Sequence, residues 1–179
     1  MRRTFLLLKK GCHAFVITAN LMRPESRGSV RLASRDPHRH PLVHLDHLSA
    51  ASDRARLREG LRLARRIADD EGVLPFIKGI VNADDLSFEH NASLDRYIAR
   101  RLQTAHHPSG IVAMASSAAT GVVDSECQVF GMEGLRVADA SIIPFPVRAN
   151  TNLTCIMIGE HLARSLSGIA QRERIVETI

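Results

Sequence analysis

The stretch TAHHPSGIVAMASSAATGVVDSECQVFGMEGLRVADASIIPFPVRANTNLTCIMIGE, residues 104–160, decides the fold predicted for this 179-residue chain. It begins with a His-Pro turn at His107. Residues 135–138, Leu-Arg-Val-Ala, follow a glycine turn, and we expect a short strand there. That strand runs directly into Asp139–Ser141.

A helix is expected after this strand. Pro144 and Pro146 bias their predecessors out of helical geometry, which predicts an extended loop. Asn150 is a preferred N-cap residue, and it precedes a heavily apolar run. The pattern predicts a largely buried helix over residues 151–166.

In this order, the turn, the strand and the helix resemble the C-terminal signature of the glucose–methanol–choline (GMC) flavoprotein oxidoreductases. The resemblance covers residues from about 21 to 168 and is most specific over 121–160. Residues 23–32 carry a second match, to a phrase of the family's substrate-binding domain. The resemblance implies an α+β fold with an antiparallel sheet and flanking helices, plus C-terminal elements that complete an absent FAD-binding domain. It also implies FAD as cofactor and a small-molecule alcohol as substrate.

The resemblance further implies an active site. His107 lies in the family's His-Pro-x-Gly phrase, and its neighbour His106 does not, so His107 is the expected base. An imidazole ordinarily titrates at about pH 6.5, so it can accept the hydroxyl proton of an alcohol at neutral pH. In the family the second catalytic residue is a His or Asn at the head of the last helix, and Asn150 matches it. An Asn at this position resembles the choline-oxidising branch. Its amide can bind the substrate oxygen but cannot act as a base. The other reading of Asn150 is a helix cap alone.

Cofactor contacts are implied by the same resemblance. A helix N-terminus stabilises negative charge, so the start of the last helix can face the flavin edge that becomes anionic on reduction. The residues implied at FAD are Asp139, Ala140, Thr151 and Asn152, and no metal is implied.

The chain departs from the family phrase after His-Pro-x-Gly. The phrase usually continues Thr-Cys-Arg-Met-Gly, whereas residues 111–115 here read IVAMA. Two alternatives therefore stand beside the oxidoreductase. One is a non-catalytic remnant or binding scaffold of the same fold. The other is a GMC-fold lyase, in which His107 removes a hydroxyl proton without a redox step.

FAD binding in this family depends on an N-terminal G-x-G-x-x-G turn, and no G-x-G occurs in the chain. We therefore expect a missing N-terminal FAD-binding half or partner chain, and an isolated chain that is incomplete and inactive. Residues 1–104 are expected to form a substrate-binding-type portion. Residues 105–170 are expected to form the active-site and flavin-facing segment, and residues 171–179 a tail.

Two more helices are predicted before His107. A serine cap, Asp53 and apolar residues at helical spacing predict a helix from residue 49 or 52 to about 70. Apolar residues at helical spacing predict a second helix over residues 93–103. We interpret the arginines of the first helix as a solvated face rather than a phosphate site. These arginines are Arg54, Arg58, Arg62, Arg65 and Arg66.

Strands are predicted before the first helix and after the His-Pro turn. Residues 13–22 are β-prone, residues 30–34 alternate as a half-buried strand does, and a Pro/Gly turn lies between them. The two segments predict an antiparallel pair. A further short strand is expected within residues 121–130.

Composition excludes several classes of protein. The net charge of +5 favours an anionic partner, but the arginines are scattered, aromatic residues make up 4% and Trp is absent, which excludes nucleic acid as the expected partner. No stretch approaches the roughly 20 apolar residues of a membrane span. The three cysteines are widely spaced, which favours a reducing compartment and a cytoplasmic location. The histidines of residues 13–47 match no familiar zinc spacing, so we interpret them as surface and loop residues.

Overall fold

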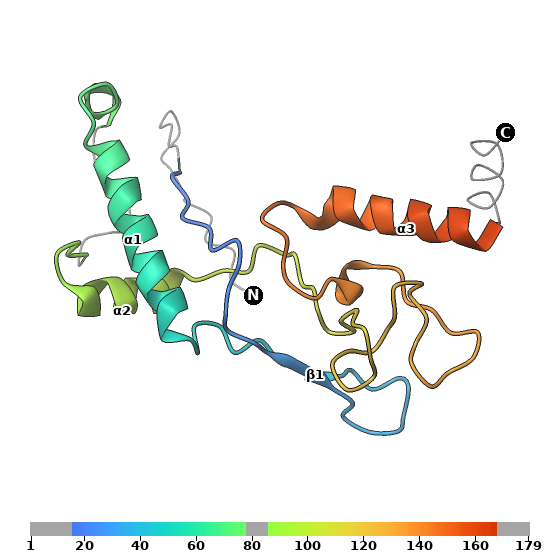
Figure 1. Cartoon of the computed structure of the whole chain (residues 1–179). Coiled ribbons are helices and arrows are strands. Elements are labelled where there is room, and N and C mark those ends of the chain that lie inside the picture. The colour runs from blue at the N-terminus through green and yellow to red at the C-terminus, as the bar shows by residue number, and fades with distance from the viewer. Residues whose placement is uncertain (1–15, 78–85, 168–179) are drawn as a thin grey trace, which may run out of the picture. The chain divides into compact units, whose positions relative to one another are not determined.

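The computed structural model describes residues 16–77 and 86–167 (Figure 1). Its chain forms two compact units, made of the described parts of residues 1–20 with 55–101 and of residues 21–54 with 102–179. Each unit is described by itself. Residues 13–15 of the first predicted strand lie outside the described part of the chain.

The first unit is helical. It holds most of α1 (Ala51–Ala68), the short helix η1 (Leu74–Phe76) and α2 (Asn91–Arg101). Both predicted helices are confirmed, α2 beginning two residues earlier than expected. Apolar spacing explains why they form here, because α1 and α2 bury the side chains that recur at helical intervals. The buried apolar residues of this unit are Leu57, Leu94 and Ile98.

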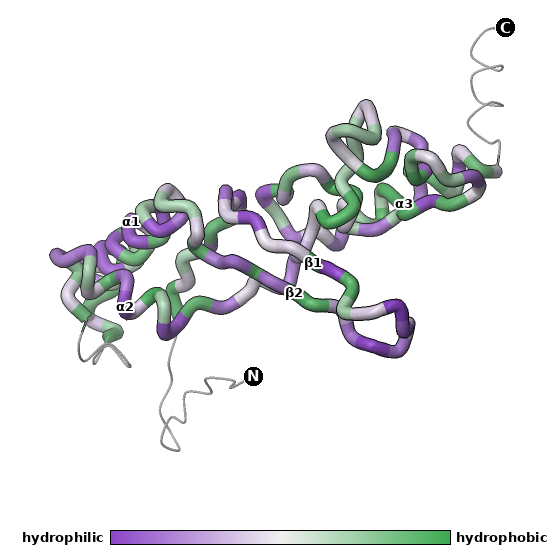
Figure 2. The backbone as a smooth tube through the Cα atoms, turned by 90° about the horizontal axis from the view of Figure 1, so that it is seen from below, coloured by the Kyte–Doolittle hydropathy of each residue, from purple (hydrophilic) through white to green (hydrophobic). Residues whose placement is uncertain are grey.

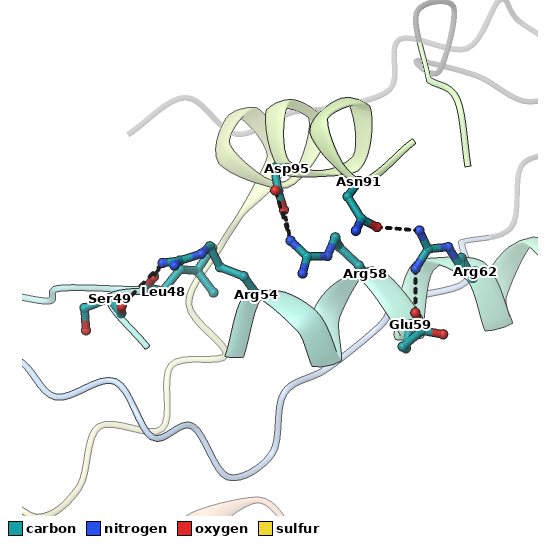
Figure 3. Close-up of polar contacts among 8 residues, drawn as sticks. All are labelled: Leu48, Ser49, Arg54, Arg58, Glu59, Arg62, Asn91 and Asp95. Atoms are coloured by element: carbon teal, nitrogen blue, oxygen red, sulfur yellow. Dashed lines mark hydrogen bonds and ion pairs between the residues drawn. The ribbon is translucent and has the colours of Figure 1, made fainter. Parts of the chain in front are cut away.

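Arginines of α1 hold α2 (Figure 3). Nη1 of Arg58 lies 3.0 Å from both carboxylate oxygens of Asp95. Arg62 donates to the Asn91 side-chain oxygen at 2.6 Å and to the Phe88 carbonyl oxygen at 3.0 Å. The interpretation of this arginine row as a solvated face is therefore wrong for Arg58 and Arg62. Their guanidinium groups bond to acceptors on the neighbouring segment rather than only to solvent.

The second unit contains a two-stranded antiparallel sheet, in which β1 (Ser29–Arg31) and β2 (Leu42–His44) run side by side (Figure 2). Ser29 pairs with His44, and Arg31 pairs with Leu42. Gly28 permits this pairing, because a Cβ there would lie 2.1 Å from the His44 carbonyl oxygen.

The predicted pairing of residues 13–22 with 30–34 is wrong for the residues that the structure describes. Residues 16–22 form no strand, and β1 pairs with β2 instead. Nor is β1 half-buried, since all three of its residues are exposed. Alternation of apolar and polar residues marks the two faces of a strand but does not name its partner, and the structure pairs β1 with the downstream segment β2, beside Gly28.

The C-terminal part of this unit is built from irregular backbone rather than from the predicted strands at 121–130 and 135–138. Isolated bridges replace those strands, and they join Met114 to Val123, Val123 to Val129 and Gln128 to Arg136. Gly121 permits the tight approach, since a Cβ there would lie 2.4 Å from the Cβ of Ala115. The strand prediction was wrong because the bridges are isolated pairs between which the backbone turns, so no continuous ladder forms.

A small core lies beneath these bridges. Val123, Cys127, Ile142 and Leu162 are buried together. Burial raises the pKa of the Cys127 thiol, so the thiol stays neutral and packs as a small apolar group. Ile142 comes from the short helix η2 (Ala140–Ile142), and Leu162 comes from α3 (Thr151–Ser167), so the core fixes α3 against η2.

Helix α3, drawn in red in Figure 1, confirms the predicted C-terminal helix but not its burial. Leu162 is its only buried residue. Leu153 is 77% exposed, and Ile156 is 60% exposed. The helix is apolar on more than one face, and the described residues cover only the face that carries Leu162. Within the described residues, no helix is long and apolar enough to span a membrane.

Candidate active site

The His-Pro turn is held against the segment that precedes α3. Gly110 has a φ of +80°, and a Cβ there would lie 3.2 Å from the Ile143 carbonyl oxygen. Beyond the turn, the Val112 amide donates to the Ser141 carbonyl oxygen at 3.0 Å and the Met114 amide donates to that of Ile142 at 2.8 Å. These bonds bring residues 107–114 next to the chain that leads into α3.

The side chain of His107 reaches the start of α3 and is bonded there at both ring nitrogens. Its Nε2 lies 3.2 Å from Oδ1 of Asn150, and its Nδ1 lies 3.1 Å from Oγ1 of Thr151. The structure therefore brings together His107, Asn150 and Thr151, which are more than 40 residues apart in sequence.

His106 takes a different position. Its backbone adopts a left-handed φ of +60°, its side chain is exposed, and its amide donates to the Thr104 hydroxyl at 3.1 Å. A left-handed φ turns the chain sharply at His106. The two histidines are therefore not equivalent in the structure.

Asn150 precedes the first residue of α3, as an N-cap residue does. Among the described residues, however, its side-chain hydrogen bond goes to His107 and not to an amide of α3. The expectation that Asn150 also caps the helix through its side chain is not met in this arrangement, because the same amide oxygen is directed at the imidazole.

Asp139 and Ala140 lie at the start of η2. The Asp139 carboxylate accepts a 2.7 Å hydrogen bond from the Ser141 amide and a second bond from the Ser141 hydroxyl. The hydroxyl bond first, and the amide bond second, hold the pKa of Asp139 below its ordinary value. Asp139 is exposed, and no hydrogen bond joins it to His107 among the described residues. Its contacts in this structure serve the local turn.

Asn152 lies in the first turn of α3 with an exposed side chain. The first four N–H groups of a helix have no partner within the helix, so this 17-residue helix presents donors beside the imidazole of His107. An imidazole, a side-chain amide and free N–H groups form a donor set that fits the edge of a flavin ring and an alcohol oxygen.

Two contacts were missed by the sequence reasoning. The first is the bond from the Ser141 amide to the Asp139 carboxylate. The Asp-x-Ser spacing is a recognisable capping signal that could have revealed this bond. Thr151 was assigned to the cofactor, but in the structure it bonds His107; no local pattern signals that pairing. No group of three His, Cys, Asp or Glu residues able to hold a metal ion occurs in residues 16–77 and 86–167.

Comparison with known proteins identifies this architecture. The profile of the family described as GMC oxidoreductase matches residues 24–159. The chain is 38% identical over 156 residues to the oxygen-dependent choline dehydrogenase of Cronobacter sakazakii, and to that of Pseudomonas aeruginosa to the same extent. Each match covers 87% of this chain but 28% of the relative, so the chain spans little more than a quarter of these proteins.

Solved structures agree on the fold. A formate oxidase superposes with a TM-score of 0.77 at 30% identity, covering 84% of this chain and 26% of that one. A variant of the Aspergillus oryzae RIB40 formate oxidase, studied for modification of its FAD, gives a TM-score of 0.75 at 28% identity over 81% of this chain and 25% of that one. The helices and small antiparallel sheet described above are consistent with the C-terminal region of these oxidases.

Proposed function

Because the chain belongs to the GMC oxidoreductase family, we propose that it is the C-terminal portion of an FAD-dependent oxidoreductase that acts on the CH–OH group of a small alcohol. The observation that carries the proposal is the contact of the His107 imidazole with Asn150 at the head of α3. The two residues that the family resemblance pairs as catalytic partners lie within hydrogen-bonding distance, although they are 43 positions apart in sequence.

In this proposal each side chain has one task. His107 accepts the proton of the substrate hydroxyl, a contribution of roughly 10²–10⁴ in rate for a general base. Asn150 donates its amide N–H to the substrate oxygen and orients it. Asp139, Ala140, Thr151 and Asn152 lie along the cofactor, with the first turn of α3 directed at the flavin edge. FAD, when bound, supplies the acceptor for the hydride that leaves the substrate carbon.

No G-x-G occurs in these residues, so we propose that an N-terminal half or a partner chain supplies the rest of the cofactor site. We propose that residues 1–104 contribute a substrate-binding portion and that residues 105–170 form the active-site segment, with residues 171–179 as a tail. The missing N-terminal FAD-binding half, or a partner chain, would cover apolar residues of α3 such as Leu153 and Ile156. The free Cys127 and Cys155 suit a cytoplasmic location, which is part of the proposal.

A fused protein provides the test. The N-terminal portion of the Cronobacter sakazakii choline dehydrogenase is joined to this chain in place of its own C-terminal region, and flavin content is measured by absorbance. Reduction of the flavin is then followed without oxygen across a series of alcohols that includes choline. We expect His107→Ala to slow reduction by roughly 10²–10⁴, and His106→Ala to have a far smaller effect.

The outcomes separate the alternatives. Equal losses in the two histidine variants would remove the assignment of the base. A flavin-loaded fusion that no alcohol reduces would favour a non-catalytic remnant, provided that the unmodified relative is reduced under the same conditions. Conversion of a hydroxylated substrate with the flavin still oxidised would favour a lyase.

A further inference from the structure

The ring of His107 has both nitrogens engaged by adjacent residues of one helix start. Oδ1 of Asn150 is a carbonyl oxygen, which accepts hydrogen bonds and never donates them. With this oxygen facing the ring at 3.2 Å, Nε2 is the nitrogen that carries the proton of the neutral ring. The lone pair is then on Nδ1, and the Thr151 hydroxyl, 3.1 Å away, donates to it.

This tautomer is the opposite of the one that a base needs at Nε2. To accept a proton from an alcohol, Nε2 must offer its lone pair, and the proton of the neutral ring must then be on Nδ1. A threonine hydroxyl is both a donor and an acceptor, so Oγ1 of Thr151 can bond Nδ1 with or without a proton there. In the exchange Nε2 gives its proton to solvent water and Nδ1 takes one from solvent water, and neither the ring nor the helix has to move.

Thr151 is well placed to hold the ring still. It is the first residue of α3 and is partly buried. Its branched Cβ restricts the side chain to few rotamers. The helix itself is fixed through Leu162, which is buried with Val123 and Ile142. The position of the hydroxyl is therefore set by the core of the unit and not by a flexible loop.

We propose that Thr151 is a positioning residue for His107, whose hydroxyl donates to Nδ1 in the free protein and accepts from Nδ1–H once the alcohol has displaced Asn150 from Nε2. The inference rests on the proposed function for its second half only. In the reaction, the O–H bond of the alcohol breaks and its proton goes to Nε2, the carbon loses hydride to the flavin, and the C=O bond forms. The imidazolium then donates Nδ1–H to Thr151 and Nε2–H to the new carbonyl oxygen.

The tautomer can be read directly without a cofactor. Histidine labelled with ¹⁵N is incorporated into the 179-residue chain, and two-bond ¹H–¹⁵N correlations are recorded at about pH 8.5, where an ordinary imidazole is neutral. His107→Gln identifies the signals of His107 by their loss. The parent is expected to show Nε2–H with an unprotonated, hydrogen-bonded Nδ1. Thr151→Val should change the Nδ1 signal and mix the two tautomers, whereas Thr151→Ser should restore the parent pattern.

A control comes from the same helix. Thr154 lies one turn after Thr151, and the hydrogen bonds of the His107 ring go to Asn150 and Thr151. Thr154→Val should therefore leave the His107 tautomer unchanged. A parent with Nδ1–H, or a Thr151→Val spectrum identical to that of the parent, would overturn the proposal whether or not the fused protein oxidises alcohols.

The second half is tested in the fused protein described above. Thr151→Val should lower kcat for flavin reduction about tenfold, the scale of one hydrogen bond, with a smaller change in KM. Thr151→Ser should recover most of that loss. An unchanged kcat in a Thr151→Val fusion that still reduces its flavin would overturn the catalytic half. A parent fusion that fails to oxidise any alcohol would instead count against the proposed function, while the NMR result still decides the resting contact.

Discussion

The buried carboxylate of Asp53 accepts hydrogen bonds from both the backbone amide and the hydroxyl of Ser26. The amide bond measures 2.8 Å and the hydroxyl bond 2.5 Å, and the Asp53 side chain has no exposed surface. The Glu25 amide donates to the same carboxylate at 3.0 Å, and the Ser26 hydroxyl oxygen accepts from the Ala50 amide. The first turn of α1 is thereby joined to the segment that leads to β1.

Asp53→Ala should therefore destabilise the protein strongly. The substitution leaves two amides and a hydroxyl without their charged acceptor, which costs about 3 kcal/mol of the free energy of unfolding. Asp69 is the matched control, because its exposed carboxylate pairs with Arg65, four positions earlier at the end of α1, and Asp69→Ala should cost about 0.5 kcal/mol or less. Urea unfolding followed by circular dichroism measures both. Equal losses would show that the Asp53 bonds contribute no more than a surface pair.

Gly110→Ala should disturb the His-Pro turn. A left-handed φ costs an ordinary residue about 1–2 kcal/mol, and the new Cβ would also press on the Ile143 carbonyl oxygen. Gly131 has a similar φ of +74°, but nothing lies within 4 Å of its Cβ position. Gly131→Ala should therefore cost less than Gly110→Ala in the same urea titration, and the difference measures the contact with Ile143. A larger loss at Gly131 would contradict this account of the turn.

Asn150 variants should affect chemistry more than stability. Asn150→Ala removes the partner of Nε2 and should slow flavin reduction in the fused protein about tenfold. Its melting temperature should stay near that of the parent, because the Asn150 side chain bonds His107 rather than the amides of α3.

Asn150→Asp tests the charge at the same position. A carboxylate beside Nε2 favours the protonated ring and disfavours the anionic reduced flavin, so reduction should be slower than in Asn150→Ala. An unchanged rate in Asn150→Asp would show that this side chain does not face the flavin.

The lowered pKa of Asp139 makes the free energy of unfolding depend on pH. Its folded-state pKa is lowered, mainly by the Ser141 hydroxyl, so this contribution to stability is complete above the ordinary carboxyl value of about 3.9 and is lost as the pH falls through the folded value. The stability difference between the parent and Ser141→Ala should therefore be greatest above about pH 4 and shrink toward pH 2. Urea midpoints measured across this range provide the check, and a difference that grows on acidification would have the wrong sign.

The isolated 179-residue chain should not retain FAD. The pyrophosphate and adenosine require a glycine-rich strand–turn–helix unit, and no G-x-G occurs in this sequence. Equilibrium dialysis and flavin fluorescence of the purified chain should show no stoichiometric binding, whereas the fused protein should be yellow. A yellow isolated chain that is bleached by an alcohol would refute the expectation.

The helices could be predicted from the sequence because their signals are local. Apolar spacing and flanking turns indicate α1, α2 and α3 within a few residues, since helix bonds join residues four apart. The pairing of His107 with Asn150 was likewise expected from the motif, and the structure brings the two side chains within 3.2 Å.

Long-range contacts were decided by the tertiary structure alone. Periodicity marks the faces of β1 but not its partner β2, and it does not reveal the bond between the Glu25 amide and Asp53, 28 positions apart. No local pattern reveals the ion pair between Arg58 and Asp95, or the hydrogen bond between the Thr151 hydroxyl and Nδ1 of His107. The sequence determines that α3 is apolar on more than one face. Which face is buried depends on the chain that packs against it. In the described residues that is the core around Leu162 alone.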